Sequence, residues 1–194
     1  MREGKIIFLR EFQLGDEGTL LRKFHDPEIF SKMDLELNGK EPTIDKEREW
    51  VIKTMNEYKQ KTPDNLNLAI IVGLHDNIRR IEELVGGVGA HKINYEKSEA
   101  EICYWVGKNH QGQGYATCAI KMFCNELFKR VSKVRAEVFD NNIASQKVLE
   151  NAGFCKVEKR PNEKTGGYDF FYERNNPLLN SKFLFRKMEV GLFR

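Results

Sequence analysis

His110-Gln111-Gly112-Gln113-Gly114-Tyr115-Ala116-Thr117 is the stretch that most restricts the fold and the function of this chain. It follows a strand-like run over 101–106 and opens an amphipathic helical pattern that continues to about residue 130. Glycines at a strand-to-helix turn leave backbone N–H groups uncovered, and the helix start adds free N–H groups and a positive dipole end. Phosphate is the usual anion for such a turn. The sequence therefore predicts a phosphorylated cofactor here.

Two common phosphate-binding folds are excluded by the neighbouring residues. A P-loop requires Gly-Lys-Ser/Thr, whereas Gly114 is followed by Tyr115 and Ala116. A dinucleotide-binding fold places its glycine turn after the first strand, with an acidic residue about 20 positions further on. Here the turn follows the fourth predicted strand, so neither class fits.

The remaining sequence predicts an α+β fold. Apolar alternation and turn signals predict strands over 5–11, 68–72, 81–92, 100–106, 134–138 and 154–160, and helices over 16–25, 43–61, 114–130 and 142–151. The seventh strand lies in 168–174 or in 182–188, and the pattern does not decide between them. Three consecutive strands between helices favour a mixed, mostly antiparallel sheet. We expect about seven strands flanked by about four helices in a single domain spanning residues 1–194.

Composition is that of an ordinary globular chain. The chain has 194 residues, 40% of them hydrophobic and 31% charged, and a net charge of +3, which is too weak to argue for nucleic acid. No apolar run approaches the roughly 20 residues of a membrane span, and residues 1–5 show no signal region, so we expect a cytoplasmic protein without a membrane partner. The four cysteines form no C-x-x-C pair and have apolar neighbours. We expect buried thiols and no metal site.

Several segments in this order resemble the GNAT superfamily of acyl-CoA-dependent N-acetyltransferases, and in particular its RimJ/RimL-like branch. The turn fits the Q/R-x-x-G-x-G/A pattern at Gln111, Gly114 and Ala116. Residues 142–154 are similar to the N-x-x-S…L-E-x-x-G-F helix of that branch. The Phe8-Leu9-Arg10 opening and the Asp26-Pro27-Glu28 break also look like it. The resemblance covers roughly residues 5–173.

The resemblance implies acetyl-CoA as cosubstrate and a slot where the fourth and fifth strands splay apart. The pantetheine arm would run beside Tyr104, Trp105 and Val106, with Asn142 bonded to it and Lys147 near the adenosine end. The CoA pyrophosphate would be held by the backbone amides of Gln111, Gly112, Gln113, Gly114, Tyr115, Ala116 and Thr117.

Acetyl transfer to an amine needs a neutral amine, a stabilised oxyanion and a stabilised leaving thiolate. A backbone N–H near Trp105 or Val106 could stabilise the oxyanion. The family's usual tyrosine acid is replaced by Leu149, so the resemblance points to Ser145, although its hydroxyl could instead serve only the helix start. Glu101 is the best candidate base, with a salt-bridge partner as the alternative role; His91 and His110 are weaker candidates.

The branch implies a primary amine acceptor, most often a protein or peptide N-terminus. A small amine (polyamine, amino acid or aminoglycoside) and a non-catalytic acyl-CoA-binding module are the alternatives. The acceptor would lie where the first two helices and the 75–80 and 161–167 loops meet the slot. Glu36, Glu41 and Glu47 could attract a cationic amine or could simply be solvated. The family includes monomers and homodimers, and the sequence favours neither.

Overall fold

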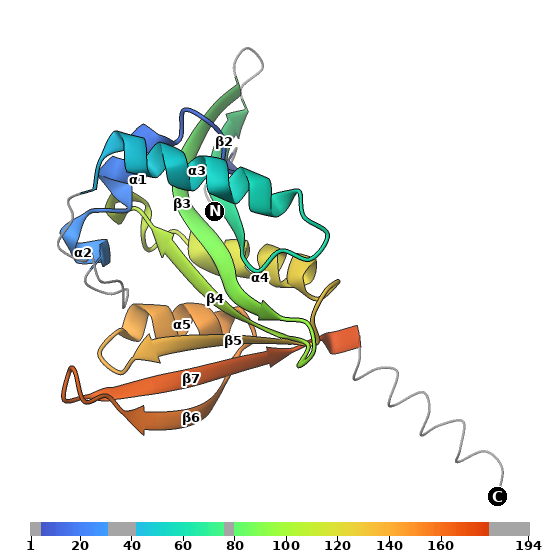
Figure 1. Cartoon of the computed structure of the whole chain (residues 1–194). Coiled ribbons are helices and arrows are strands. Elements are labelled where there is room, and N and C mark those ends of the chain that lie inside the picture. Colours follow the sequence, from blue (N-terminus) through green and yellow to red (C-terminus); the bar gives the residue numbers. More distant parts are fainter. Residues whose placement is uncertain (1–4, 31–41, 76–79, 179–194) are drawn as a thin grey trace, which may run out of the picture.

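A computed structural model describes residues 5–30, 42–75 and 80–178 (Figure 1). The strands and helices follow one another in the predicted order, with one further helical turn at Pro27. The strands are β1 (Lys5–Glu11), β2 (Leu66–His75), β3 (Arg80–Asn94), β4 (Glu99–Val106), β5 (Lys133–Phe139), β6 (Cys155–Pro161) and β7 (Tyr168–Asn175). The helices are α1 (Glu17–Lys23), α2 (Pro27–Phe30), α3 (Ile44–Tyr58), α4 (Tyr115–Leu127) and α5 (Ile143–Asn151), with a 3₁₀ turn, η1, at Lys108–His110.

The seven strands form one sheet in the order β1-β2-β3-β4-β5-β7-β6. Every neighbouring pair is antiparallel except β4 and β5, which confirms the mixed, mostly antiparallel sheet. The seventh strand is Tyr168–Asn175, the first of the two predicted alternatives. Residues 182–188, the second alternative, lie outside the described part of the chain, as does most of the predicted 75–80 loop.

β4 and β5 separate soon after they begin. Their parallel register joins only Glu99–Glu101 to Lys133–Arg135, although β4 continues to Val106. Beyond that point β4 stays paired with β3 on its other side, through Gly86↔Val106 and Gly87↔Trp105. The expected splay is therefore present, and it leaves one edge of residues 102–106 without a neighbouring strand.

Two hydrophobic clusters lie on opposite faces of the sheet. The larger cluster packs α4 and α5 against one face, with Phe123 and Leu149 fully buried. The smaller cluster packs α1 and α3 against the other face, through Leu20 and Val51, and it reaches no further across the sheet than Trp105 on β4. Within the described residues, no helix covers this second face of β5, β7 and β6 (Figure 1).

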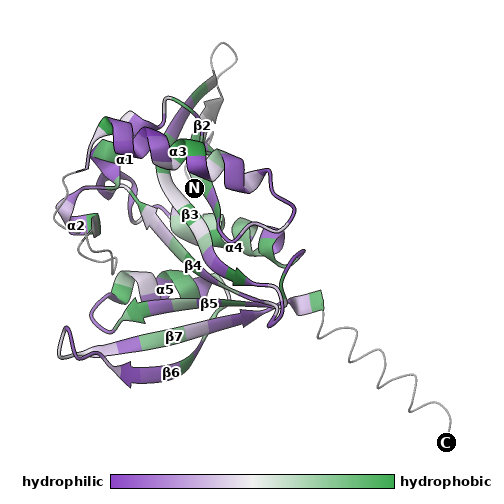
Figure 2. Ribbon diagram, viewed as in Figure 1, coloured by the Kyte–Doolittle hydropathy of each residue, from purple (hydrophilic) through white to green (hydrophobic). Residues whose placement is uncertain are grey.

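Hydropathy follows this layering. Figure 2 shows α4 largely apolar, whereas α3 and the edge strand β6 carry mostly hydrophilic residues. All seven residues of β6 are exposed, so the expectation that all four cysteines are buried is wrong at Cys155; of the others, Cys124 is buried and Cys103 and Cys118 are partly exposed. A sheet edge has only one neighbouring strand, which is why apolar sequence neighbours did not bury Cys155. No helix in the described ranges is long and apolar enough to cross a membrane.

Local capping explains where the site helices begin and end. The Thr43 hydroxyl accepts the Lys46 N–H at the start of α3, and the Asn142 side chain accepts the Ser145 N–H at the start of α5. Gly153 ends α5 with a φ of +88°, as predicted for a glycine cap. The glycines of β3 were expected to mark a bulge or a close approach of another segment, and β3 shows both. Its register with β2 shifts between Ile70 and Ile71, and a Cβ on Gly86 would lie 2.3 Å from the Trp105 carbonyl oxygen.

Candidate functional site: a slot between two strands

The glycine turn leaves a run of backbone donors without protein acceptors. Gly112 and Gly114 have φ values of +71° and +82°, in the left-handed region that glycine adopts without strain. The next paired amide after Gln111 is that of Cys118, which donates to the Gly114 carbonyl. Among the described residues, the N–H groups of 112–117 therefore have no protein acceptor. Six successive donors at a helix start suit an anion with several oxygens, such as a diphosphate.

Side chains of the turn form hydrogen bonds that fix its conformation. Gln111 donates from Nε2 to the Val106 carbonyl at 3.0 Å, which ties the turn to the end of β4. Buried Tyr115 donates its hydroxyl to Gln113 Oε1 at 3.0 Å. These contacts leave the backbone exposed, so the predicted cradle consists of main-chain atoms.

A pair of hydroxyl groups joins the unpaired part of β4 to the start of α5. The Tyr104 hydroxyl is 2.5 Å from Ser145 Oγ, and it also lies 3.2 Å from the Ser145 carbonyl. Asn142 Oδ1 accepts the Ser145 N–H at 3.1 Å, which fixes the start of α5. Burial raises the pKa of the Tyr104 phenol, so this hydroxyl stays protonated at neutral pH. The structure therefore brings Tyr104, Asn142 and Ser145 together, whereas Leu149 is buried in the core.

Trp105 and Val106 occupy the last positions of β4 beyond its pairing with β5. The Val106 side chain packs in the α4–α5 cluster and the Trp105 ring in the α1–α3 cluster. The Trp105 main chain can pass this close to β3 because Gly86 carries no side chain, and the Trp105 indole lies against Gly87 for the same reason. The side chains of these two residues thus pack on opposite faces of the sheet, and their main chain forms the edge of the slot.

Glu101 lies apart from this group, in the short segment where β4 still pairs with β5. Its Oε1 is 3.3 Å from His91 Nε2, and this hydrogen bond lowers the pKa of the Glu101 carboxyl. Contacts with the Cys103 sulfur and the Glu101 carboxylate raise the pKa of His91. Four residues of extended strand, about 13 Å, separate Glu101 from Trp105. Proton transfer to Glu101 from the end of the slot would therefore require a relay.

His110 belongs to a cluster that ties the turn to α1 and β3. Its Nε2 lies 3.1 Å from Glu83 Oε1 and 3.2 Å from Lys23 Nζ, and burial lowers the pKa of its imidazole. Lys23 also donates to the Leu84 carbonyl at 2.9 Å. His110 thus flanks the turn, and Lys23 is a cation near it that the sequence analysis missed because it lies 87 residues earlier.

The predicted acidic residues of the acceptor side are only partly described, since Glu36 and Glu41 lie outside the described residues. Glu47 is buried on α3, and its Oε1 lies 2.8 Å from His25 Nε2 at the end of α1. This pair was not predicted, because no motif links residues 22 positions apart on different helices. The pair lines a cavity of about 270 Å³ whose other wall includes Trp105.

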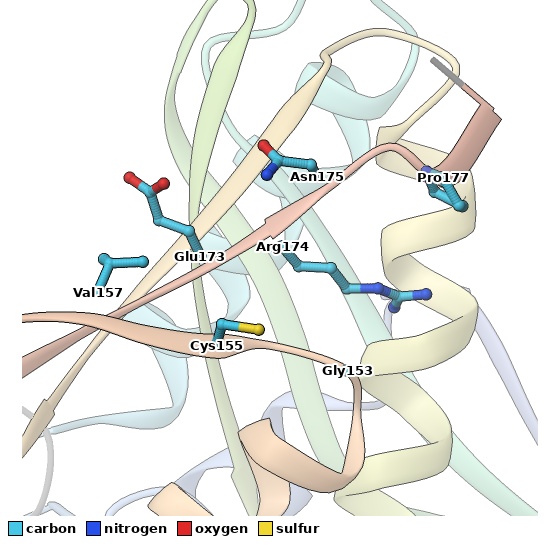
Figure 3. A pocket seen from close by; sticks show the side chains of 7 residues that line it. All are labelled: Gly153, Cys155, Val157, Glu173, Arg174, Asn175 and Pro177. Carbon is cyan, nitrogen blue, oxygen red and sulfur yellow. The ribbon is translucent and has the colours of Figure 1, made fainter. Parts of the chain in front are cut away.

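A second cavity, of about 330 Å³, lies elsewhere on the molecule (Figure 3). Its walls come from the end of α5 and from β6 and β7, with Arg174 and Glu173 among them, and it contains no predicted site residue. Lys147 is exposed on α5. Within the described ranges, no three His, Cys, Asp or Glu side chains are grouped to hold a metal ion.

Comparison with known proteins assigns the family. The sequence profile of the acetyltransferase (GNAT) domain matches residues 7–155, more than three quarters of the chain. This protein therefore belongs to the GNAT acetyltransferases, and the family identifies it as an acetyl-CoA-dependent N-acetyltransferase. Acetyl-CoA as cosubstrate agrees with the solved structures of this fold that contain acetyl-CoA or CoA.

Individual relatives agree on the family. An N-acetyltransferase called p20 from Bacillus licheniformis is 28% identical over 151 residues, which cover 76% of this chain and 78% of that one. Mycobacterium smegmatis RimJ, solved with CoA-disulfide, has a TM-score of 0.73 at 17% identity, covering 89% and 83% of the two chains. Spermidine N-acetyltransferase from Vibrio cholerae, solved with CoA and spermine, has a TM-score of 0.68 at 18% identity, covering 87% and 95%. At such identities the two structures support the fold alone.

Proposed function

We propose that this acetyltransferase acts on the primary amine at the N-terminus of a protein or peptide. The observation that carries the proposal is the second face of β5, β7 and β6 beside the splay, which no helix of the described residues covers. The acyl end of a CoA bound from the α4–α5 side would emerge at this face. An extended peptide could lie there with its first residue at the slot, whereas a closed acidic pocket would suit only a small amine.

The roles of the site residues follow from their positions. The free amides of 112–117, beginning directly after Gln111, bind the pyrophosphate, and the unpaired edge of β4 at Tyr104, Trp105 and Val106 pairs with the pantetheine arm. Asn142, whose Oδ1 is used in capping, keeps its amide N–H groups to donate to that arm. Lys147 approaches the adenosine end of the cosubstrate.

Ser145 stabilises the departing thiolate, and Tyr104 supplies the hydrogen bond that orients its hydroxyl. A backbone N–H near Trp105 or Val106 stabilises the oxyanion. Glu101, paired with His91, receives the amine proton through water, because a direct transfer over about 13 Å of strand is not possible.

The test of the proposal is release of free CoA thiol from acetyl-CoA across an acceptor panel. Peptides with varied N-termini are compared with the same peptides carrying a blocked N-terminus, and with polyamines, amino acids and an aminoglycoside. We expect turnover with free peptide N-termini and none with the blocked forms.

Two other results would contradict this acceptor class. Turnover confined to the small amines would assign a small-molecule acetyltransferase, which is the second candidate because a cavity of about 270 Å³ lies beside Trp105. Tight acetyl-CoA binding with no thiol release by any amine would indicate a non-catalytic acyl-CoA-binding module.

A further inference from the structure

A cavity on the acceptor side of the sheet adjoins the slot. It lies between α1, α3 and β4, with a volume of about 270 Å³, just below the range typical of ligand pockets. Its lining residues are Leu20, Phe24, His25, Lys46, Glu47, Trp50 and Trp105. Trp105 takes part in both sites, since its main chain borders the splay and its ring lines this cavity. A group bound here would be close to the end of the slot.

Aromatic rings form much of the cavity wall. Trp50 packs edge-on against Phe12 with ring centroids 4.9 Å apart, and Phe24 lies 5.3 Å from the Trp105 ring. Both tryptophans are thus held by neighbours from the core of this face. Indole faces attract alkylammonium and guanidinium groups through the ring quadrupole, and the attraction strengthens when water is excluded.

One carboxylate lies among these rings. The side chains of Glu47 and His25 are each only 12% exposed, and their hydrogen bond of 2.8 Å fixes the carboxylate. In this bond the carboxylate of Glu47 is the acceptor. The exposed Lys46 also lines the cavity, whereas its neighbour Arg48 is paired with Glu17 at 3.1 Å. Solvent screens Lys46 more than it screens the buried Glu47.

The reacting amine is a poor partner for this carboxylate. Attack on the thioester requires a neutral nitrogen, whereas a nearby carboxylate favours the protonated form. An acceptor nitrogen held by Glu47 would therefore be kept unreactive. A cation that is not acetylated has no such conflict.

We propose that this cavity binds a second, positively charged group of the acceptor, such as an alkylammonium group, while a different amine of the same molecule is acetylated. Glu47 is the anionic partner of that group, and His25 is a positioning residue for Glu47. The inference rests on the proposed transfer to a primary amine and narrows its acceptor class. The charged group can be a lysine side chain near a peptide N-terminus or the distal amine of a diamine.

Matched acceptor pairs test this inference in the full-length protein. One arm compares a peptide starting Ala-Lys, its lysine side chain trimethylated, with the same peptide carrying norleucine. The other arm compares a diamine with the monoamine of equal length. We expect kcat/KM for the charged member to be higher by about tenfold or more in at least one arm, and that arm identifies the source of the cation.

Glu47→Gln should abolish this preference by raising KM for the charged acceptor, with KM for acetyl-CoA unchanged. Glu49→Gln is the matched control, because Glu49 lies on the same helix but is exposed. His25→Asn should reduce the preference partly and leave kcat with neutral acceptors unchanged, which general destabilisation would not do. If Glu47→Gln folds poorly, butyltrimethylammonium replaces it as the probe, and it should inhibit the wild type competitively against the acceptor.

The outcomes separate this inference from the proposed function. Thiol release without preference for the charged acceptor, or a preference that survives Glu47→Gln, overturns the inference alone. Failure of butyltrimethylammonium to compete also overturns it. Absence of thiol release with every amine overturns the proposed function itself.

Discussion

At the scale of single residues, the pair of hydroxyls at the slot is the feature with the clearest chemical consequence. The family's tyrosine on the helix is Leu149 here, buried in the core, yet a phenol still reaches the site from β4 through Tyr104. Its high pKa, caused by burial, makes Tyr104 a hydrogen-bond partner that does not ionise at neutral pH. We therefore propose that Ser145 hydrogen-bonds the departing thiolate while Tyr104 orients its hydroxyl, so that the two hydroxyls act as a unit.

Removing either hydroxyl should slow the chemical step. Ser145→Ala should lower kcat by about 100-fold, the usual order for losing one hydrogen bond to a charge that develops in the transition state, and Tyr104→Phe by a smaller factor. Because the two hydroxyls act together, the double variant should be little slower than Ser145→Ala alone. Steady-state kinetics with the best acceptor measures all three, and calorimetric acetyl-CoA affinity is the folding control. Multiplicative losses would show that the hydroxyls act independently.

At the scale of elements, the turn before α4 depends on backbone conformation more than on side chains. A Cβ at Gly112 would have no atom within 4 Å, but its φ of +71° is strained for any other residue. Gly166 in the β6–β7 loop has a φ of +70° and equally open surroundings. The two glycines thus have the same conformational demand, and only one lies in the proposed cradle.

Gly112→Ala and Gly166→Ala should each reduce the free energy of unfolding by about 1 kcal/mol, the cost of a left-handed conformation with a Cβ. Only Gly112→Ala should also weaken CoA binding, because it disturbs the free amides of 112–117. Denaturant unfolding and calorimetric titration with CoA measure the two effects. Equal CoA affinity in both variants would argue against the cradle.

At the scale of the whole molecule, the slot exists because the two halves of the sheet share only three residue pairs, at the start of β4 and β5. A ligand that pairs with the open edge of β4 and with the start of α4 joins these halves. Binding of such a ligand to the folded state alone stabilises it in proportion to the logarithm of ligand concentration.

Acetyl-CoA at 100 times its Kd should therefore stabilise the fold by about 2.7 kcal/mol. For a chain of this size, that corresponds to a rise in Tm of about 5–10 °C, measurable by scanning calorimetry. Adenosine alone should produce a much smaller shift, because it lacks the diphosphate and the pantetheine arm. A similar shift with adenosine would place the main binding energy outside the turn and the slot.

Much of this molecule follows from local sequence. Period-2 alternation predicted β2 and β5, Thr43 and Asn142 marked helix starts, and the glycines at 112, 114 and 153 adopt positive φ angles, as glycines at turns and helix ends commonly do. These features depend on neighbours within a few positions, so a single sequence carries them. The turn itself was found because its donors belong to consecutive residues.

Tertiary structure alone decided what lies together from distant segments. The Tyr104–Ser145 bond joins residues 41 positions apart, and the His25–Glu47 pair joins two helices that the sequence could not orient. The exposure of Cys155 also depends on β6 being an edge strand. Such contacts arise from strand order and from the face of the sheet that each helix covers. Strand order and helix placement are determined by packing of the whole chain, so they cannot be predicted from residues that are close in sequence.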